Sequence, residues 1–152
     1  MNFTPNFDTS TKEADKNAYE SVTMYMTTNL VTFKPEDEIG DVIRTLMEKQ
    51  ISGAPVLNEK RELIGIISEQ DCLRVIIDSV YHNHPISKHV VKEYMNKDLI
   101  TLSVHDDVVN AANMFLKHRF RRFPVVENGI LRGLVSKRDI LAAAHKMQTT
   151  TW

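Results

Sequence analysis

The sequence has very little cysteine, which limits how the fold can be stabilised. Cys72 is the single cysteine among 152 residues, so the chain forms no internal disulfide bond. The segment before Met24 lacks the charged start and apolar stretch of a secretory leader. Neither secretion nor an oxidising compartment is supported, and we expect the protein in the cytoplasm.

Long hydrophobic runs and an excess of charge of one sign are also missing. Apolar runs such as residues 64–67 are far shorter than the roughly 20 residues of a membrane-spanning helix, so no membrane insertion is expected. The 19 basic and 20 acidic residues leave a formal net charge of −1, which gives no global field to recruit nucleic acid or an anionic membrane. Because 42% of the residues are apolar, the chain can still supply a core.

A recognisable catalytic set is absent as well. The sequence holds no nucleophile elbow, no phosphate-binding P-loop and no helical zinc-protease motif. His82 and His84 lie close together, but no third metal ligand can be assigned, so we interpret them as polar linker residues. Cys72 has no obvious activating partner and falls on the early, buried part of an expected helix. We therefore expect no catalytic residue, no metal, no cofactor and no enzymatic activity.

What the sequence does contain is an internal repeat. Residues of the first half recur 69 positions later, as Pro55 recurs at Pro124. After the first hairpin turn the spacing is 68, as Asp71 recurs at Asp139, because the second turn is one residue shorter. The other positions of the first copy that recur are Val22, Tyr25, Met26, Leu30, Thr32, Asp37, Val56, Gly65, Ser68 and Leu73.

Both copies predict the same order of elements. A short β-like run at residues 30–33 precedes Asp37, which can cap a helix, and residues 99–102 with Asp106 repeat this arrangement. Apolar residues then recur with helical spacing. Two apolar stretches around a polar turn predict a hairpin, and a last helix follows.

This order predicts an α/β (α+β) fold built from two βαββα repeats. The repeats occupy residues 21–80 and 90–146, and the connector between them at 81–89 is too short to hold independent domains apart. Residues 1–20 are expected to form a flexible arm, and residues 147–152 form a tail.

The pattern Ser-x-x-Asp opens the last helix of each copy, at Ser68 and Asp71 and again at Ser136 and Asp139. Free N–H groups and the helix dipole favour a phosphate there, and the carboxylate one turn later can accept both hydroxyls of a ribose. The same pattern is also a capping box, which needs no ligand. Its recurrence favours a nucleotide without excluding the cap, since duplicated helices need duplicated caps.

A basic and aromatic segment at residues 117–124 precedes a core strand of the second copy. Its arginines Arg119, Arg121 and Arg122 would repel one another without an acidic partner or a bound anion, so a phosphate is attractive there. Single-stranded nucleic acid also uses arginine beside aromatic residues. The net charge of −1 argues against such an extended footprint, and no nucleic-acid partner is expected.

The repeat and its Ser-x-x-Asp ends resemble a tandem CBS-domain pair, the Bateman module. The resemblance covers residues 22 to about 144 and depends on six elements in order: MTTNLVTFKPED and MNKDLITLSVHDD, ISGAPVLNE and FRRFPVVEN, and GIISEQDCL and GLVSKRDIL. It implies that the repeats pack through their sheets with pseudo-twofold symmetry. Two clefts result, each combining the motif of one repeat with the opening strand and pre-proline segment of the other.

The resemblance also implies nucleotide-binding residues. One cleft would use Ser136 and Asp139, with adenine near Thr28, Leu30, Ile51 and Ser52. The other would use Ser68 and Asp71, with the base near Leu99, Phe120 and Arg121 and the phosphate near Arg122. The phosphate ends of both could share Arg121, Arg122, Lys137 and Arg138. We expect the Asp139 cleft to be preferred, because copy two holds more cations and Glu69 of copy one would repel a polyphosphate by about 1–4 kcal/mol.

The expected function is a non-catalytic regulatory module that binds AMP, ADP or ATP and signals to an unidentified partner protein. A homodimer is expected through apolar faces of the last helices, formed by Ile76, Ile77, Val80 and Leu141. Two alternatives stay open. One is a protein-interaction or dimerisation module that needs no ligand, and the other is a sensor of another adenosyl ligand such as S-adenosylmethionine.

Overall fold

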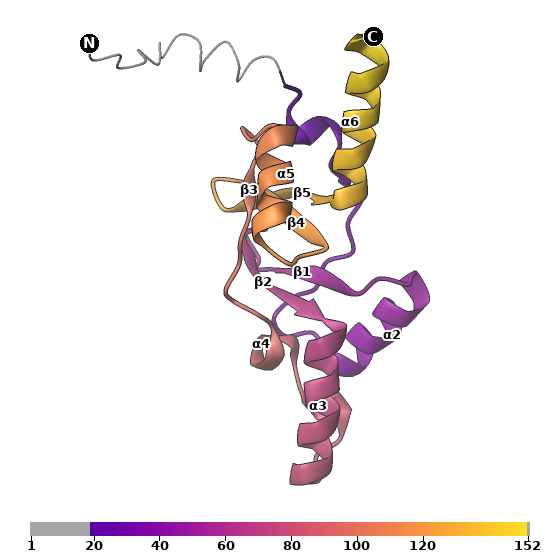
Figure 1. Ribbon diagram of the computed structural model, residues 1–152. Helices are drawn as coiled ribbons and strands as arrows, with labels where there is room; N and C mark the ends of the chain where they lie inside the picture. The colour runs from indigo at the N-terminus through magenta and orange to yellow at the C-terminus, as the bar shows by residue number, and fades with distance from the viewer. Residues whose placement is uncertain (1–18, 152) are drawn as a thin grey trace, which may run out of the picture.

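The computed structural model describes residues 19–151 and arranges them in two lobes (Figure 1). The first lobe contains α2 (Ile39–Lys49), β1 (Gly53–Leu57), β2 (Leu63–Ser68) and α3 (Glu69–His82). The second contains β3 (Leu102–Ser103), α5 (Val108–Lys117), β4 (Arg122–Glu127), β5 (Ile130–Ser136) and α6 (Lys137–Thr151). Three short helical turns lie in the connections: η1 (Val22–Met24), η2 (Ile86–Lys88) and α4 (Val91–Tyr94). The predicted mixed fold of two repeats is confirmed.

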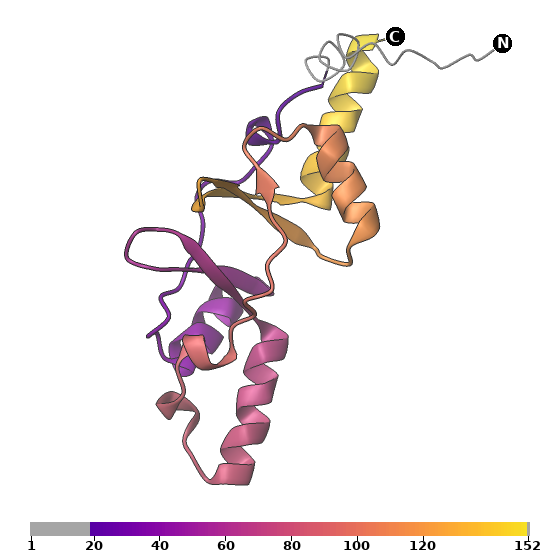
Figure 2. The same ribbon diagram turned by 90° about the vertical axis from the view of Figure 1, so that its left-hand side faces the viewer.

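Each lobe is a hairpin with helices on its outer side. β1 pairs with β2 and β4 pairs with β5, both antiparallel, and β3 adds to β4 in parallel. The two hairpins lie side by side in the middle of the molecule, and α3 and α6 extend to opposite ends (Figure 1; Figure 2). The hairpin turns also touch, since the Leu63 N–H donates to the Gly129 carbonyl at 3.0 Å. The repeats therefore meet through their sheets.

The opening segment of each repeat pairs with the hairpin of the other lobe. Thr27 and Leu134 of β5 exchange two backbone hydrogen bonds, at 2.8 and 3.0 Å. Asn96 and Ile66 of β2 exchange two more, also at 2.8 and 3.0 Å. Each lobe is thus completed by the opening segment of the other repeat.

The two hydrophobic cores follow this exchange. Val22, which precedes the first repeat's helix, is fully buried in the core of the second lobe together with Phe123 and Val135. Val91 is fully buried in the core of the first lobe, where it joins Ile39 among other residues. Apolar burial therefore ties each opening segment to the opposite lobe.

The helix caps predicted at Asp37 and Asp106 are wrong by one residue. Helix α5 is capped by Asp107, and the residue before α2 makes no side-chain cap hydrogen bond. Asp37 and Asp106 instead accept hydrogen bonds from backbone N–H groups three residues earlier, Lys34 at 2.8 Å and Ser103 at 2.7 Å. Each carboxylate closes the turn before the helix rather than capping the helix itself.

The opening strands are shorter than predicted. Residues 30–33 contribute a single parallel bridge, between Phe33 and Val56, and β3 takes only the last residue of the predicted strand at 99–102. The chain crosses from one lobe to the other within these residues. It therefore cannot follow one sheet edge over the whole predicted length.

Most of the arm expected at residues 1–20, and the end of the tail at Trp152, lie outside the described residues. Within residues 19–151, no helix combines the length and the apolar character needed to span a bilayer.

We expect Gly133→Ala to destabilise the protein by about 1–3 kcal/mol through overpacking. A Cβ atom at this position would lie 2.8 Å from the Thr27 carbonyl oxygen and 2.7 Å from the Met26 sulfur. Gly40→Ala in α2 is the matched control, because a Cβ there meets nothing within 4 Å, and it should stabilise by about 0.5–1 kcal/mol. Urea unfolding measures both, and an unchanged midpoint for Gly133→Ala would contradict the close approach.

Candidate functional site

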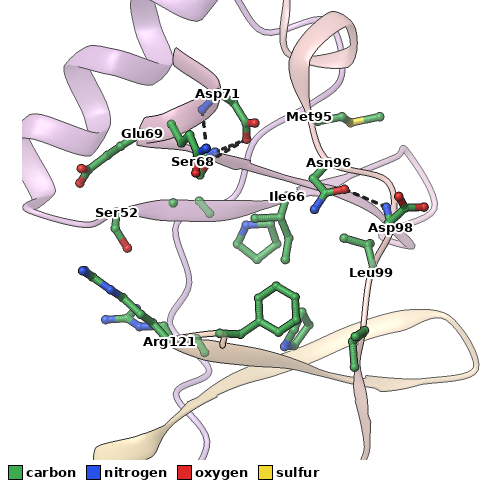
Figure 3. Close-up of a pocket in the computed structure, with 18 of the residues that line it drawn as sticks. Ser52, Ile66, Ser68, Glu69, Asp71, Met95, Asn96, Asp98, Leu99 and Arg121 are labelled. Carbon is green, nitrogen blue, oxygen red and sulfur yellow. Dashed lines mark hydrogen bonds between the residues drawn. The ribbon is translucent and has the colours of Figure 1, made fainter. Parts of the chain in front are cut away.

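A cavity of about 870 Å³ lies between the two lobes. One wall comes from the first lobe, at the start of β1 and at the junction of β2 with α3, and the other comes from residues 94–100 and 119–122. Ser52, Glu69 and Arg121 lie towards one end of the cavity, and Asp98 and Leu99 lie towards the other (Figure 3). A ligand that fills this space contacts both repeats.

Asp71 is fixed in the wall of the cavity by the capping box of α3. Its Oδ2 accepts hydrogen bonds from the backbone N–H and the hydroxyl of Ser68, each at 2.9 Å (Figure 3). In return, the Asp71 N–H donates to Ser68 Oγ at 3.3 Å. The residue is only 5% exposed. A carboxylate held in this way is already oriented towards a ligand in the cavity.

The other oxygen of this carboxylate, Oδ1, accepts a hydrogen bond from Arg74 Nη1 at 3.1 Å. Arg74 lies three residues further along α3, and its side chain is 61% exposed and lines the cavity. An ion pair this exposed contributes only about 0–1 kcal/mol to folding. Its position at the cavity matters more than its effect on stability.

Cationic side chains outnumber carboxylates in the cavity lining. Five cations face three carboxylates, which leaves an excess of two positive charges; the residues are Arg74, Lys97, Arg119, Arg121 and Arg122, against Glu69, Asp71 and Asp98. Charges lining a recess attract an opposite charge more strongly than the same charges spread over an open surface. The cavity therefore favours an anionic ligand.

The remaining lining is largely apolar. Phe120 is 39% exposed, and its ring packs edge-on against Phe123 with centroids 5.7 Å apart. The other apolar residues of the lining include Pro55, Ile66, Leu99, Ile100, Pro124 and Leu134. Such a surface suits a flat heterocycle attached to the anionic group.

A family model for the CBS domain matches residues 21–78 and again residues 91–146. The chain belongs to the CBS-domain family. The resemblance recognised in the sequence is confirmed, and both matches coincide with the two repeats.

Several relatives share this CBS-domain pair. Protein MJ1225 of Methanocaldococcus jannaschii is 30% identical over 80% of this chain and 42% of that protein. An inosine-5′-monophosphate dehydrogenase of Aquifex aeolicus is 33% identical over 76% of this chain and 23% of the enzyme. The chain thus spans less than half the length of either relative. CBSX2 of Arabidopsis thaliana, whose crystal structure in complex with AMP is known, is 29% identical in sequence to this chain. The two structures align with a TM-score of 0.73 over 84% of this chain and 98% of CBSX2.

The cavity of this CBS-domain pair gathers half of the predicted site residues. The residues that the resemblance assigned to the Asp71 cleft all line this cavity, namely Ser68, Asp71, Leu99, Phe120, Arg121 and Arg122. Ser52, which the resemblance assigned to the other cleft, lines it as well. The remaining seven lie in the described part of the chain but outside this lining: Thr28, Leu30, Ile51, Ser136, Lys137, Arg138 and Asp139.

The second motif forms the same cap without joining this cavity. The Ser136 N–H donates to Asp139 Oδ2 at 2.8 Å, and the Asp139 N–H donates to Ser136 Oγ at 3.2 Å. The expected preference for the Asp139 cleft depended on the cations of copy two. Arg121 and Arg122 line the Asp71 cavity, the cleft to which the resemblance also assigned them, because the segment before β4 faces the first lobe. Binding at Asp139 stays a prediction.

Sequence reasoning missed Arg74, Asn96 and Asp98. Arg74 had a local signal, since a cation three residues beyond Asp71 on one helix is positioned for an ion pair. Asn96 and Asp98, joined by a hydrogen bond from the Asp98 N–H to Asn96 Oδ1 at 3.0 Å, had none. They reach the cavity only because the chain crosses between the lobes there.

Cys72 lies next to Asp71 and is buried. Burial, and then the charges of Asp71 and Glu69, raise the pKa of its thiol to about 11. A raised pKa favours the neutral thiol, which is a poor nucleophile.

We expect iodoacetamide to label native Cys72 about 100-fold more slowly at pH 8 than it labels a free cysteine. The labelling rate should still rise at pH 10, because the pKa of the thiol is about 11. Mass spectrometry of the native chain follows the reaction, with the urea-unfolded chain as the control. A rate that levels off near pH 9 would contradict the raised pKa.

Proposed function

We propose that this CBS-domain pair is a non-catalytic regulatory module that binds AMP, ADP or ATP in the Asp71 cavity. The observation that carries the proposal is a buried carboxylate of one repeat and an arginine cluster of the other around one cavity. Asp71 accepts the ribose hydroxyls, Arg121 and Arg122 hold the phosphate, and Phe120 contacts the base. The AMP complex of the similar protein CBSX2 supports this class of ligand.

The charge of the cavity favours a nucleotide over S-adenosylmethionine. The sulfonium of S-adenosylmethionine is a cation, which an excess of positive charge repels, whereas a phosphate is attracted. A module that needs no ligand would require only the two caps. Such a module leaves unexplained why Arg119, Arg121 and Arg122 line a cavity yet form no ion pair within residues 19–151.

Ligand binding can reach a partner protein through the angle between the lobes. A nucleotide in the cavity contacts both repeats, so it stabilises the relative orientation that fits it best. A regulated protein that binds one orientation better than the other then reads the nucleotide concentration.

We also propose that the chain acts as a homodimer through the outer faces of α3 and α6. Leu73, Ile77 and Val80 form an exposed stripe along α3 at helical spacing, with side chains 56–75% exposed. Leu141 on α6 is 67% exposed. The buried side of α3 is formed by other residues, so this stripe is available to a second copy.

Calorimetric titration of the full chain tests nucleotide binding. We expect at least one of AMP, ADP and ATP to bind, and to bind more tightly than adenosine or S-adenosylmethionine, which carry no phosphate. Asp71→Asn should weaken binding about 10- to 100-fold, because hydrogen bonds to a charged group contribute roughly 1.5–3 kcal/mol.

Asp139→Asn is the matched control, because it alters the same cap in the other repeat and leaves the Asp71 cavity intact. Its affinity should equal that of the wild type. Loss confined to Asp139→Asn would move the ligand to the other cleft, and equal loss in both variants would mean that the caps act through folding. A wild-type chain that binds none of the three nucleotides would end the proposal.

We expect Ile77→Glu to convert the dimer to a monomer, because it introduces a charge into the centre of the α3 stripe. Sedimentation velocity on the wild type and the variant gives the mass. Lys60→Glu, a charge reversal at an exposed turn residue, is the control and should stay dimeric. A monomeric wild type at micromolar concentration would refute the dimer and leave nucleotide binding untouched.

A further inference from the structure

The hydrogen-bond capacity of the Asp71 carboxylate is largely used within the protein. An ionised carboxylate accepts about four hydrogen bonds. Oδ2 accepts two from Ser68, each at 2.9 Å, and Oδ1 accepts one from Arg74 at 3.1 Å. One position therefore remains for an outside donor.

A ribose offers two hydroxyl donors, so one of the three internal hydrogen bonds must give way. The Ser68 hydroxyl can rotate, whereas the Ser68 N–H is fixed by the backbone. Once it turns away from Asp71, the Ser68 hydroxyl can donate to a phosphate oxygen. The hydrogen bonds from the Ser68 N–H and from Arg74 then hold the two carboxylate oxygens, one each.

We propose that Arg74 is a positioning residue for the nucleotide: it fixes Asp71 Oδ1 so that the carboxylate accepts both ribose hydroxyls. The inference rests on the proposed function. It deepens that function by assigning selectivity for a ribose to a pair of residues rather than to Asp71 alone. Arg74 acts through Asp71 and needs no contact with the ligand.

The second repeat shows that Arg74 is not needed for the cap. Ala142 stands 68 residues after Arg74, at the equivalent position, yet Ser136 and Asp139 form the same backbone hydrogen bonds as their counterparts. The capping box therefore folds without a cation three residues beyond the aspartate. Only the repeat whose aspartate lines the cavity described above carries the arginine.

Arg74 lies one helical turn beyond Asp71, so their ion pair runs along α3. Arg74 lines both the main cavity and a second recess of about 370 Å³ along α3, which Leu73 and Ile77 also line. Asp71 lines the main cavity but not this recess. The arginine therefore stands between the two spaces, whereas the carboxylate belongs to the cavity.

Affinity for AMP relative to an analogue that lacks both ribose hydroxyls tests this role. We expect the wild type to prefer AMP by about tenfold or more, the equivalent of a hydrogen bond to a charged group. Arg74→Ala should reduce this preference to within about threefold, because it weakens the binding of AMP while the dideoxy analogue binds as before. Arg74→Lys should fall between, because an ammonium is a point charge without the planar fork of a guanidinium.

Arg44→Ala is the matched control. Arg44 forms an ion pair of the same i,i+3 type with Asp41 on α2, at 2.7 Å and 64% exposed, and neither residue lines the cavity. This variant should keep both affinities, and both alanine variants should share one melting temperature.

The outcomes separate the two proposals. An equal loss for AMP and its dideoxy analogue in Arg74→Ala would mean that the arginine contacts the phosphate, and it would overturn the positioning role. An unchanged preference would overturn it as well, while nucleotide binding stands. A wild type that binds neither ligand would remove the proposed function and this inference together.

Discussion

The exchanged pairing of the opening segments is the interaction on which the rest of the structure depends. Asn96 of the second repeat's opening segment exchanges two backbone hydrogen bonds with Ile66 of the first lobe, and Thr27 makes the equivalent pair with the second lobe. The approach is so close that a Cβ on Gly65 would lie 2.6 Å from the sulfur of Met95. Without this pairing each hairpin would expose an unpaired edge and part of its core. Neither repeat is complete alone.

The candidate site is a consequence of this exchange. The chain is hydrogen-bonded to the first lobe at Asn96 and pairs with β4 of the second lobe at Leu102, so the residues between them must cross from one lobe to the other. Asp98 and Leu99 belong to this crossing and line the cavity. Since the same crossing joins the lobes, a ligand beside it bears directly on their relative orientation. Topology, rather than any single motif, places the cavity at this point.

Local patterns predicted the elements and failed where long-range packing decides. Ile39 and Val42 are buried as helical spacing requires. Asp37 was assigned as a cap because acidic residues favour that position, but its reach back to the Lys34 N–H excludes it. Ser52, which the resemblance assigned to the Asp139 cleft, lines the Asp71 cavity, because the sequence does not say which lobe a loop faces. The strand predicted at residues 99–102 was too long for the same reason.

The two Ser-x-x-Asp motifs fold alike, so the motif does not distinguish a ligand site from the start of a helix. Both aspartates accept from the backbone N–H of their serine, at 2.9 Å and 2.8 Å. The difference lies in residues that the cap does not need, above all Arg74 and the arginines Arg121 and Arg122 contributed by the opposite repeat. The positions that fold each unit recur in both repeats, whereas these cavity-lining positions differ between them. The asymmetry of these cations, superimposed on a symmetric fold, is what makes one cavity suited to an anionic ligand.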